Sequence, residues 1–251
     1  MPTELLYLND SYVREFRATV LAVTPDQGVI LDRTAFYPGG GGQPHDTGEL
    51  VSIDGRSWRV VSLRRSTTAD EIVHLLDREP PPVGTSVRGL LDWERRYRLM
   101  RFHTALHVLS AVVFREFGAL VTGANLDVDK ARMDFELEDL APERVARIEQ
   151  LANEAIARGL PVRWWTIPRA EAERIPDLIR TKVNLLPPSI QSIRVVEISG
   201  LDLQADGGTH VRDTREIGGI RVIGTRSKGR NNKRIEIALV DQAENERTEE
   251  S

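Results

Sequence analysis

The apolar residues of this chain change their spacing at Trp93, and this change constrains the fold more than any other feature. Before Trp93, short segments rich in β-branched residues alternate with Gly, Pro, Asp and Ser. After it, apolar residues recur every three or four positions as far as Phe117, the period of a helix with one buried face. The earlier segments predict a small antiparallel β-barrel; they are residues 12–23, 28–34, 48–54, 58–65, 71–77 and 86–92.

Helix and strand patterns mix in the remainder of the chain. Helices are predicted over 93–117, ended by Gly118, over 142–158, ended by Gly159, and near 169–180. Strands are predicted at 161–167, 193–199, 219–225 and 234–240, with residues 226–233 as a hairpin connection between the last two. We therefore expect an α+β fold with two domains, a barrel with a Gly-rich loop over 1–91 and a two-layer domain over 92–251. The second has its helices on one face of a largely antiparallel sheet.

Composition excludes several classes of protein. The 251 residues include no cysteine, so disulfides and thiolate metal ligands are excluded, which fits a cytoplasmic protein. No apolar run has the length of a membrane span, and the N-terminus does not resemble a secretory signal. The net charge of −4 argues against indiscriminate nucleic-acid binding. A local basic run is either solvated surface or a site for phosphates; it contains Arg226, Lys228, Arg230, Lys233 and Arg234.

Two of the five histidines, His103 and His107, are four positions apart on the first predicted helix. Residues at this spacing are neighbours on a helix surface, and such a pair can bind one metal ion. The alternative is a pair of hydrogen-bonded histidines at the edge of the core. Two ligands alone do not make a site, so this motif does not decide between them.

A second element, Asp206-Gly-Gly-Thr-His210, lies between two predicted strands. Its adjacent glycines exclude a regular helix and allow both ends to face one point. One interpretation is an Asp-Gly turn. The other is half of a metal site, because three imidazoles and one carboxylate satisfy tetrahedral zinc, as do three ligands and a water.

These motifs together resemble a known family. DWERRYRLMRFHTALHVL at 92–109 and GGTHVRDTREIGGIRV at 207–222 are similar to the editing domain of alanyl-tRNA synthetases. FYPGGGGQPHDTG at 36–48 and the chain length resemble the freestanding AlaX editing proteins that carry an N-terminal barrel. The resemblance implies a hydrolase that deacylates seryl-tRNA(Ala), and also glycyl-tRNA(Ala), without ATP. It further implies a bound zinc and an α+β domain shared with threonyl-tRNA synthetases.

The resemblance assigns the metal ligands residue by residue. His103, His107 and His210 match three ligands of the family, and Asp206 stands where the family usually has cysteine. A carboxylate is a harder zinc ligand than a thiolate, so we expect one Zn²⁺ per chain or another divalent metal in its place. If Asp206 did not coordinate, it would be the candidate general base.

The resemblance also assigns the substrate contacts. Gly39, Gly40, Gly41, Gly42 and Gln43 would reach the editing pocket and select serine over alanine, whereas the alternative is a flexible loop or tight turn.

Thr104 would place a hydroxyl over the pocket, unless it bonds back to a helix carbonyl. The basic run at 226–234 would hold the acceptor stem of an alanine-specific tRNA. The rival functions are editing of seryl-tRNA(Thr), a weakened aminoacyl-tRNA binder and a general zinc esterase.

Overall fold

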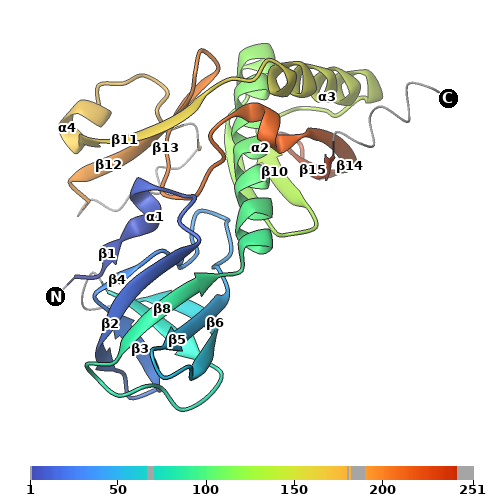
Figure 1. The fold of residues 1–251 in the computed structure, drawn as a ribbon. Helices are drawn as coiled ribbons and strands as arrows, with labels where there is room; N and C mark the ends of the chain where they lie inside the picture. The colour runs from blue at the N-terminus through green and yellow to red at the C-terminus, as the bar shows by residue number, and fades with distance from the viewer. Residues whose placement is uncertain (1, 67–70, 180, 182–189, 242–251) are drawn as a thin grey trace. The chain divides into compact units, whose positions relative to one another are not determined.

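The computed structural model describes residues 2–66, 71–179, 181 and 190–241. Its contacts divide the chain into two compact units, Met1–Arg98 and Leu99–Ser251, which are described separately below. The division falls inside helix α2 (Trp93–Phe117), which begins in the first unit and continues through the second (Figure 1). The domain boundary at 91/92 therefore stays a prediction.

The first unit contains a closed antiparallel barrel, as the sequence predicts. Its strands run in the order β2-β3-β7-β6-β5-β8 around the barrel (Figure 1). They are β2 (Glu15–Val23), β3 (Gly28–Leu31), β5 (Gly48–Ser52), β6 (Ser57–Arg65), β7 (Ile72–Leu76) and β8 (Ser86–Leu91). Three short elements flank the barrel: β1 (Glu4–Leu5), α1 (Leu6–Asn9) and β4 (Arg33–Thr34), in which β1 pairs parallel with β4.

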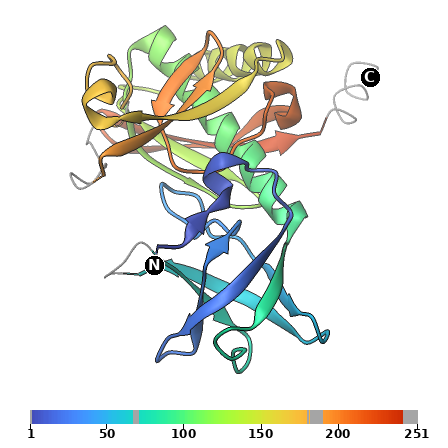
Figure 2. The ribbon, with the colours of Figure 1, turned by 60° about the vertical axis from the view of Figure 1, so that its left-hand side comes forward.

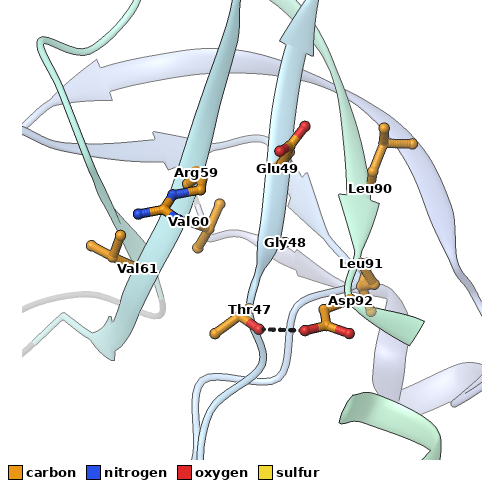
Figure 3. Close-up of a pocket in the computed structure, with 9 residues that line it drawn as sticks. All are labelled: Thr47, Gly48, Glu49, Arg59, Val60, Val61, Leu90, Leu91 and Asp92. Carbon is orange, nitrogen blue, oxygen red and sulfur yellow. Dashed lines mark hydrogen bonds between the residues drawn. The ribbon is translucent and has the colours of Figure 1, made fainter. Parts of the chain in front are cut away.

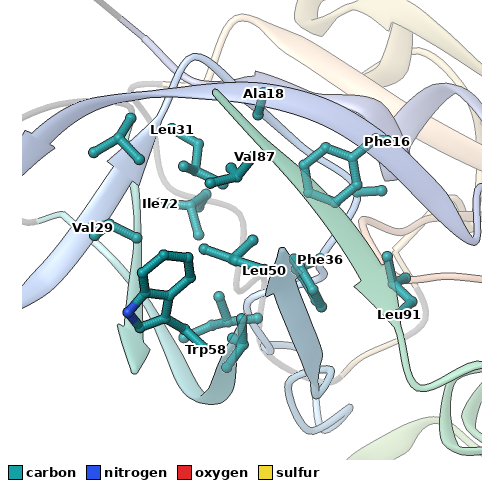
Figure 4. Close-up of a cluster of buried hydrophobic side chains, with 14 residues drawn as sticks. Phe16, Ala18, Val29, Leu31, Phe36, Leu50, Trp58, Ile72, Val87 and Leu91 are labelled. Carbon is teal, nitrogen blue, oxygen red and sulfur yellow. The ribbon is translucent and has the colours of Figure 1, made fainter. Parts of the chain in front are cut away.

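Alternate residues of the barrel strands fill its interior. Figure 4 shows these side chains converging, with Leu50 among the rings of Trp58, Phe36 and Phe16. Full burial of one such side chain contributes about 1.5–3 kcal/mol, so this cluster is the main source of stability in the unit. Gly89 lies opposite Phe16, and a Cβ at Gly89 would meet the Phe16 ring at 2.3 Å. The glycine therefore makes room for the aromatic side chain on the neighbouring strand.

The second unit combines helices with two antiparallel sheets. The four-stranded sheet has the order β14 (Gly219–Gly229), β15 (Asn232–Val240), β10 (Ala131–Phe135) and β9 (Val121–Leu126). The three-stranded sheet has the order β11 (Val162–Pro168), β12 (Ser192–Ile198) and β13 (Asp202–Ala205). The other elements are α3 (Pro142–Ala157), α4 (Arg169–Ala172) and the 3₁₀ helix η1 (Thr214–Ile217). Figure 2 shows the same ribbon from a second side.

Helix α3 is fixed to β14 by side chains. The Asn153 amide donates to the Ile220 carbonyl and accepts from the Ile220 N–H, at 2.9 and 2.8 Å. One turn earlier, Glu149 accepts from the N–H of Val222. The apolar face of α3 is buried at Ile148 and Ala152, as its spacing predicts.

Several details of the second unit differ from prediction. The described residues of the second unit form two sheets where one was expected, and β9, β10, β13 and η1 were not foreseen. The predicted connection 226–233 is mostly strand, because β14 and β15 continue to a turn at residues 230–231. The predicted helix near 169–180 is the four-residue α4, and residue 180 lies outside the described residues. Among the described residues, no helix has the length and hydropathy needed to cross a membrane.

Candidate metal centre

Two imidazoles of the site project from α2. His103 and His107 lie one turn apart, and their ring centroids are 5.3 Å from each other. Both side chains are buried, with 5% and 7% of each residue exposed. The helix is apolar around them, at Phe102, Leu106 and Val108 among other positions, so the rings are held in a protein interior.

The segment after β13 brings the other two predicted ligands to the same point. The Gly208 N–H donates to Asp206 Oδ2 at 2.7 Å, which closes a tight Asx-type turn. His210 follows this turn and is completely buried. Neither Gly207 nor Gly208 has a positive φ, so the aspartate side chain, and not left-handed backbone, shapes the turn. The two interpretations of this motif, turn and half-site, are therefore compatible.

The four predicted ligands converge. One donor atom from each of His103, His107, Asp206 and His210 lies within 4.8 Å of all the others. Asp206 Oδ1 is 3.4 Å from His103 Nε2, and Asp206 Oδ2 is 2.9 Å from His210 Nε2. The ring centroids of His103 and His210 are 4.3 Å apart. This cluster could hold a metal ion.

Hydrogen bonds to Thr104 fix the tautomer of His210. The Thr104 hydroxyl donates its proton to the Met100 carbonyl at 2.9 Å, as helix-internal threonines do. Its oxygen accepts from the Val211 N–H and lies 3.2 Å from His210 Nδ1. Because the hydroxyl proton is already donated, His210 Nδ1 must be the donor to Thr104. The lone pair of His210 Nε2 then points at Asp206.

The protonation states at this contact favour a cation. Burial alone would raise the pKa of Asp206, but the neighbouring imidazoles, first of all that of His103, outweigh burial and hold this pKa well below its usual value. Burial and the proximity of His103 push the pKa of His210 well below its usual value. An ionised carboxylate and a neutral imidazole therefore lie with Asp206 Oδ2 and His210 Nε2 2.9 Å apart, and both can donate a lone pair to a bound cation. The donor set fits a divalent metal.

Two further polar residues border the site. Asp202, whose side chain is completely buried, lies 2.9 Å from His107 Nδ1. Arg194 donates to the Asp206 carbonyl at 3.0 Å and stacks over the Trp164 ring. Sequence reasoning missed both. Polar residues at alternate positions, Asp202, Gln204 and Asp206, were the signal that could have indicated a strand with a polar face.

The predicted Gly-rich loop is a short, well-defined hairpin in the first unit. At its base, the Asp46 N–H donates to the Tyr37 carbonyl, and the Tyr37 N–H donates to the Asp46 carboxylate. At its tip, the backbones of Gly40 and Gln43 form two reciprocal N–H to carbonyl hydrogen bonds, each of 3.0 Å. Gly41 and Gly42 form the two-residue turn with φ of 58° and 88°, and Gly39 and Gly40 also have positive φ. L-residues with side chains rarely adopt these angles, so this turn favours glycine. Gln43 is buried.

The basic run divides into two kinds of side chain. Lys228 and Arg234 both bind the Asp134 carboxylate of β10, at 2.7–2.9 Å. Lys233 is buried and donates to the carbonyls of Gly229 and Arg230. Among the described residues, Arg226 and Arg230 are exposed and form no ion pair.

A groove of about 630 Å³ opens on the barrel wall, over β5, β6 and β8 (Figure 3). A hydrogen bond of 3.2 Å between Thr47 and Asp92 crosses one end of it. None of the predicted site residues lines this groove, which is formed by Thr47, Gly48, Glu49, Arg59, Val60, Val61, Leu90, Leu91 and Asp92.

Comparison with known proteins decides the family. The model of the threonyl and alanyl tRNA synthetase second additional domain matches residues 193–236, and that of the class II (A) tRNA synthetases matches residues 8–95. The alanyl-tRNA editing protein AlaX-M of Methanosarcina barkeri is 43% identical over 244 residues, 95% of this chain and 100% of that protein. This chain belongs to the AlaX-M alanyl-tRNA editing family.

Other relatives agree with this assignment. The AlaX-M protein of Saccharolobus solfataricus is 42% identical over 234 residues, 93% of this chain and 97% of that protein. The alanine–tRNA ligase of Pyrobaculum neutrophilum is 42% identical over 227 residues, which are 88% of this chain but 25% of the ligase. Membership in the AlaX-M family confirms the resemblance found in the sequence and the prediction of an editing enzyme.

Proposed function

We propose that this AlaX-M family member is a trans-editing hydrolase that deacylates seryl-tRNA(Ala), and also glycyl-tRNA(Ala), by metal-assisted ester hydrolysis. The observation that carries the proposal is the convergence of His103, His107, Asp206 and His210, in a chain whose relatives are alanyl-tRNA editing proteins. Hydrolysis of an aminoacyl ester is downhill, so ATP is not required. A site in the cytoplasm, where aminoacyl-tRNA is used, follows from this role.

The four converging residues would hold one Zn²⁺ per chain. When bound, the ion supplies a Lewis acid that orients the ester or lowers the pKa of a water. An oxygen of water adds to the ester carbonyl carbon, the bond from that carbon to the ribose oxygen breaks, and the ribose oxygen takes a proton. Buried imidazoles with fixed tautomers keep the donor atoms in place during this step. Asp206 contributes a carboxylate oxygen, which also suits harder divalent metals such as Mn²⁺.

Thr104 and Gln43 have different roles in this proposal. The Thr104 hydroxyl, engaged with Met100 and His210, orients a ligand and does not have to touch the substrate. Selection of serine over alanine needs a group that forms a hydrogen bond with the serine hydroxyl. When alanine occupies such a site, this group is left without a partner, and alanine is rejected. Gln43 and the backbone of Gly39–Gly42 are the proposed selecting groups.

The tRNA is held by phosphate contacts, which position without specifying sequence. Arg226 and Arg230 are the members of the basic run that remain available for this, whereas Lys228, Lys233 and Arg234 support the β14–β15 hairpin. The logarithm of the tRNA association constant falls linearly with log [salt], and each lost phosphate contact makes this negative slope shallower by about 0.7–0.9. Replacing Arg226 and Arg230 by Gln should therefore make the slope shallower by about 1.5. An unchanged slope would mean that the tRNA does not bind at these two residues.

Two measurements on protein purified without chelators test the function. Elemental analysis should find one zinc per chain, and seryl-tRNA(Ala) should lose its serine while alanyl-tRNA(Ala) stays intact. His103→Ala should abolish turnover, whereas Gln150→Ala, on the exposed side of α3, should leave it unchanged.

The rival functions are outcomes of the same assay. Preference for seryl-tRNA(Thr) would move the protein to the threonine branch. Tight tRNA binding without turnover in Zn²⁺, Mn²⁺ or Co²⁺ would identify a binder. Hydrolysis of small esters with no tRNA requirement would identify a general esterase.

A further inference from the structure

We infer that Asp202 is a positioning residue of the metal centre, which fixes His107 so that its Nε2 faces the metal. The inference rests on the metal site of the proposed function. It concerns a residue that lies outside both ligand motifs and 95 positions from the histidine that it contacts.

Asp202 is the first residue of β13 and pairs with Ile198 of β12. Its side chain is completely buried, and its Oδ2 lies 2.9 Å from His107 Nδ1. The same oxygen accepts a hydrogen bond of 2.8 Å from the Gln204 amide. The Gln204 amide also reaches Ser110 Oγ at 3.5 Å, one turn beyond His107 on α2. Asp202 and Gln204 therefore tie β13 to the helix turn that carries the ligand.

The contact sets the tautomer of His107. A carboxylate oxygen accepts hydrogen bonds, so Nδ1 of His107 carries the proton and Nε2 keeps its lone pair. His210 has the same arrangement, but its Nδ1 donates to the neutral hydroxyl of Thr104. Both rings therefore offer Nε2 to the site, and the partner at Nδ1 is a carboxylate for His107 but a hydroxyl for His210. Such a partner fixes the ring and raises its basicity as a ligand.

Two substitutions of Asp202 can separate the effect of its charge from that of its hydrogen bonds with His107 and Gln204. Both hydrogen bonds go to Oδ2, so an asparagine whose oxygen occupies this place keeps both hydrogen bonds and removes only the charge. Asp202→Leu removes the charge and the hold on the ring together. Loss of such a partner typically weakens metal binding by about 10–100-fold. We expect about a 10-fold loss for Asp202→Asn and a loss near 100-fold for Asp202→Leu.

The neighbouring residue pair supplies a matched control. Glu197 pairs with Leu203, directly beside the Ile198–Asp202 pair, and successive strand residues point to opposite faces. Glu197→Gln removes the same charge from the same strand pair on the face away from His107. Its metal affinity should stay within two-fold of the wild type.

The experiment measures Zn²⁺ affinity by competition with a chromophoric chelator, together with the Co²⁺ absorption spectrum. Equal affinities for Asp202→Asn, Asp202→Leu and Glu197→Gln would overturn the inference and leave the proposed function intact. Absence of any metal binding by the wild-type protein would overturn both. Long-range ¹H–¹⁵N spectra of the wild type keep the test independent of variant folding. They should show His107 protonated at Nδ1, and a ring protonated at Nε2 would refute the assignment.

Discussion

The buried ion pair of Arg96 and Asp46 should be the most sensitive point of the first unit. Arg96 is an early residue of α2, and both side chains are almost completely buried, with 0% and 1% exposed. The guanidinium donates to both carboxylate oxygens of Asp46 and to the carbonyls of Ser11 and Ala35, the last two at 2.9 and 2.5 Å. Asp46 also accepts the N–H of Tyr37 at the base of the glycine hairpin. One arginine thus joins three segments of the unit.

Arg96→Met leaves Asp46 as a buried charge without its partner. Breaking a buried pair in this way costs about 3–5 kcal/mol. The carbonyls of Ser11 and Ala35 also lose a donor, at about 1 kcal/mol each. The expected loss is therefore about 5–7 kcal/mol, which is comparable to the whole stability of an ordinary domain, about 5–15 kcal/mol. Asp46→Leu in the same chain removes the uncompensated charge and should restore part of this loss.

Urea unfolding followed by the fluorescence of Trp58 and Trp93 measures this effect, with Trp164 and Trp165 of the second unit replaced by Phe in every variant compared. Arg88→Met is the matched control, since Arg88 pairs with Glu15 on the barrel surface at 3.5 Å with about half of each side chain exposed. An exposed pair contributes about 0–1 kcal/mol, so this variant should unfold almost as the wild type does. Equal losses for the two variants would refute the reasoning. Faster amide exchange at Gly40 and Gln43 should accompany Arg96→Met alone.

Three further predictions concern the barrel, the hairpin and the metal. Burial lowers the pKa of His74 from 6.5 to about 4, so stability should fall as the pH drops from 6.5 towards 4. The loss should approach about 3 kcal/mol, at 1.36 kcal/mol per pKa unit, and His74→Gln should remove this dependence in urea titrations. Gly41→Ala, at a φ of 58° with open space around the Cβ, should cost about 1–2 kcal/mol in unfolding experiments, and Gly41→Asn less. Asp206→Cys should raise Zn²⁺ affinity relative to Mn²⁺ in competition titrations; an unchanged ratio would mean that residue 206 is not a ligand.

The sequence predicted those elements whose pattern is long and self-contained. Helix α2 has the predicted bounds, because 25 residues of regular spacing leave no alternative period. Strands β9 and β10 were missed, since segments such as VTGANL carry little apolar alternation. They become strands only because β10 pairs with β15 and β9 pairs with β10. The basic residues 226–229 looked like a connection for a related reason. They extend β14, and Lys228 gains its partner from Asp134, 94 residues away.

The candidate site divides in the same way. The His103–His107 pair and the Asp206–His210 segment are local patterns, so the sequence indicated both, and the structure brings their four side chains together. The groups that orient these side chains are not local. Asp202 meets His107 only because β13 lies against α2. The role of Thr104 depends on its hydroxyl proton, which is donated to the Met100 carbonyl and so leaves the oxygen to accept from other groups. Spacing cannot reveal such contacts.

Asp206 explains how a site without cysteine can be well ordered. One carboxylate oxygen accepts the Gly208 N–H and so holds the turn, while the other faces His103. A thiolate has a single donor atom and is a weak acceptor, so it could not both bind a metal and close this turn equally well. Compared with cysteine, aspartate therefore gives up the metal affinity of a thiolate but holds the backbone of the turn in place before a metal binds. Because Thr104 and Asp202 fix the rings of His210 and His107 independently of the metal, three of the four donor groups are oriented by the protein alone.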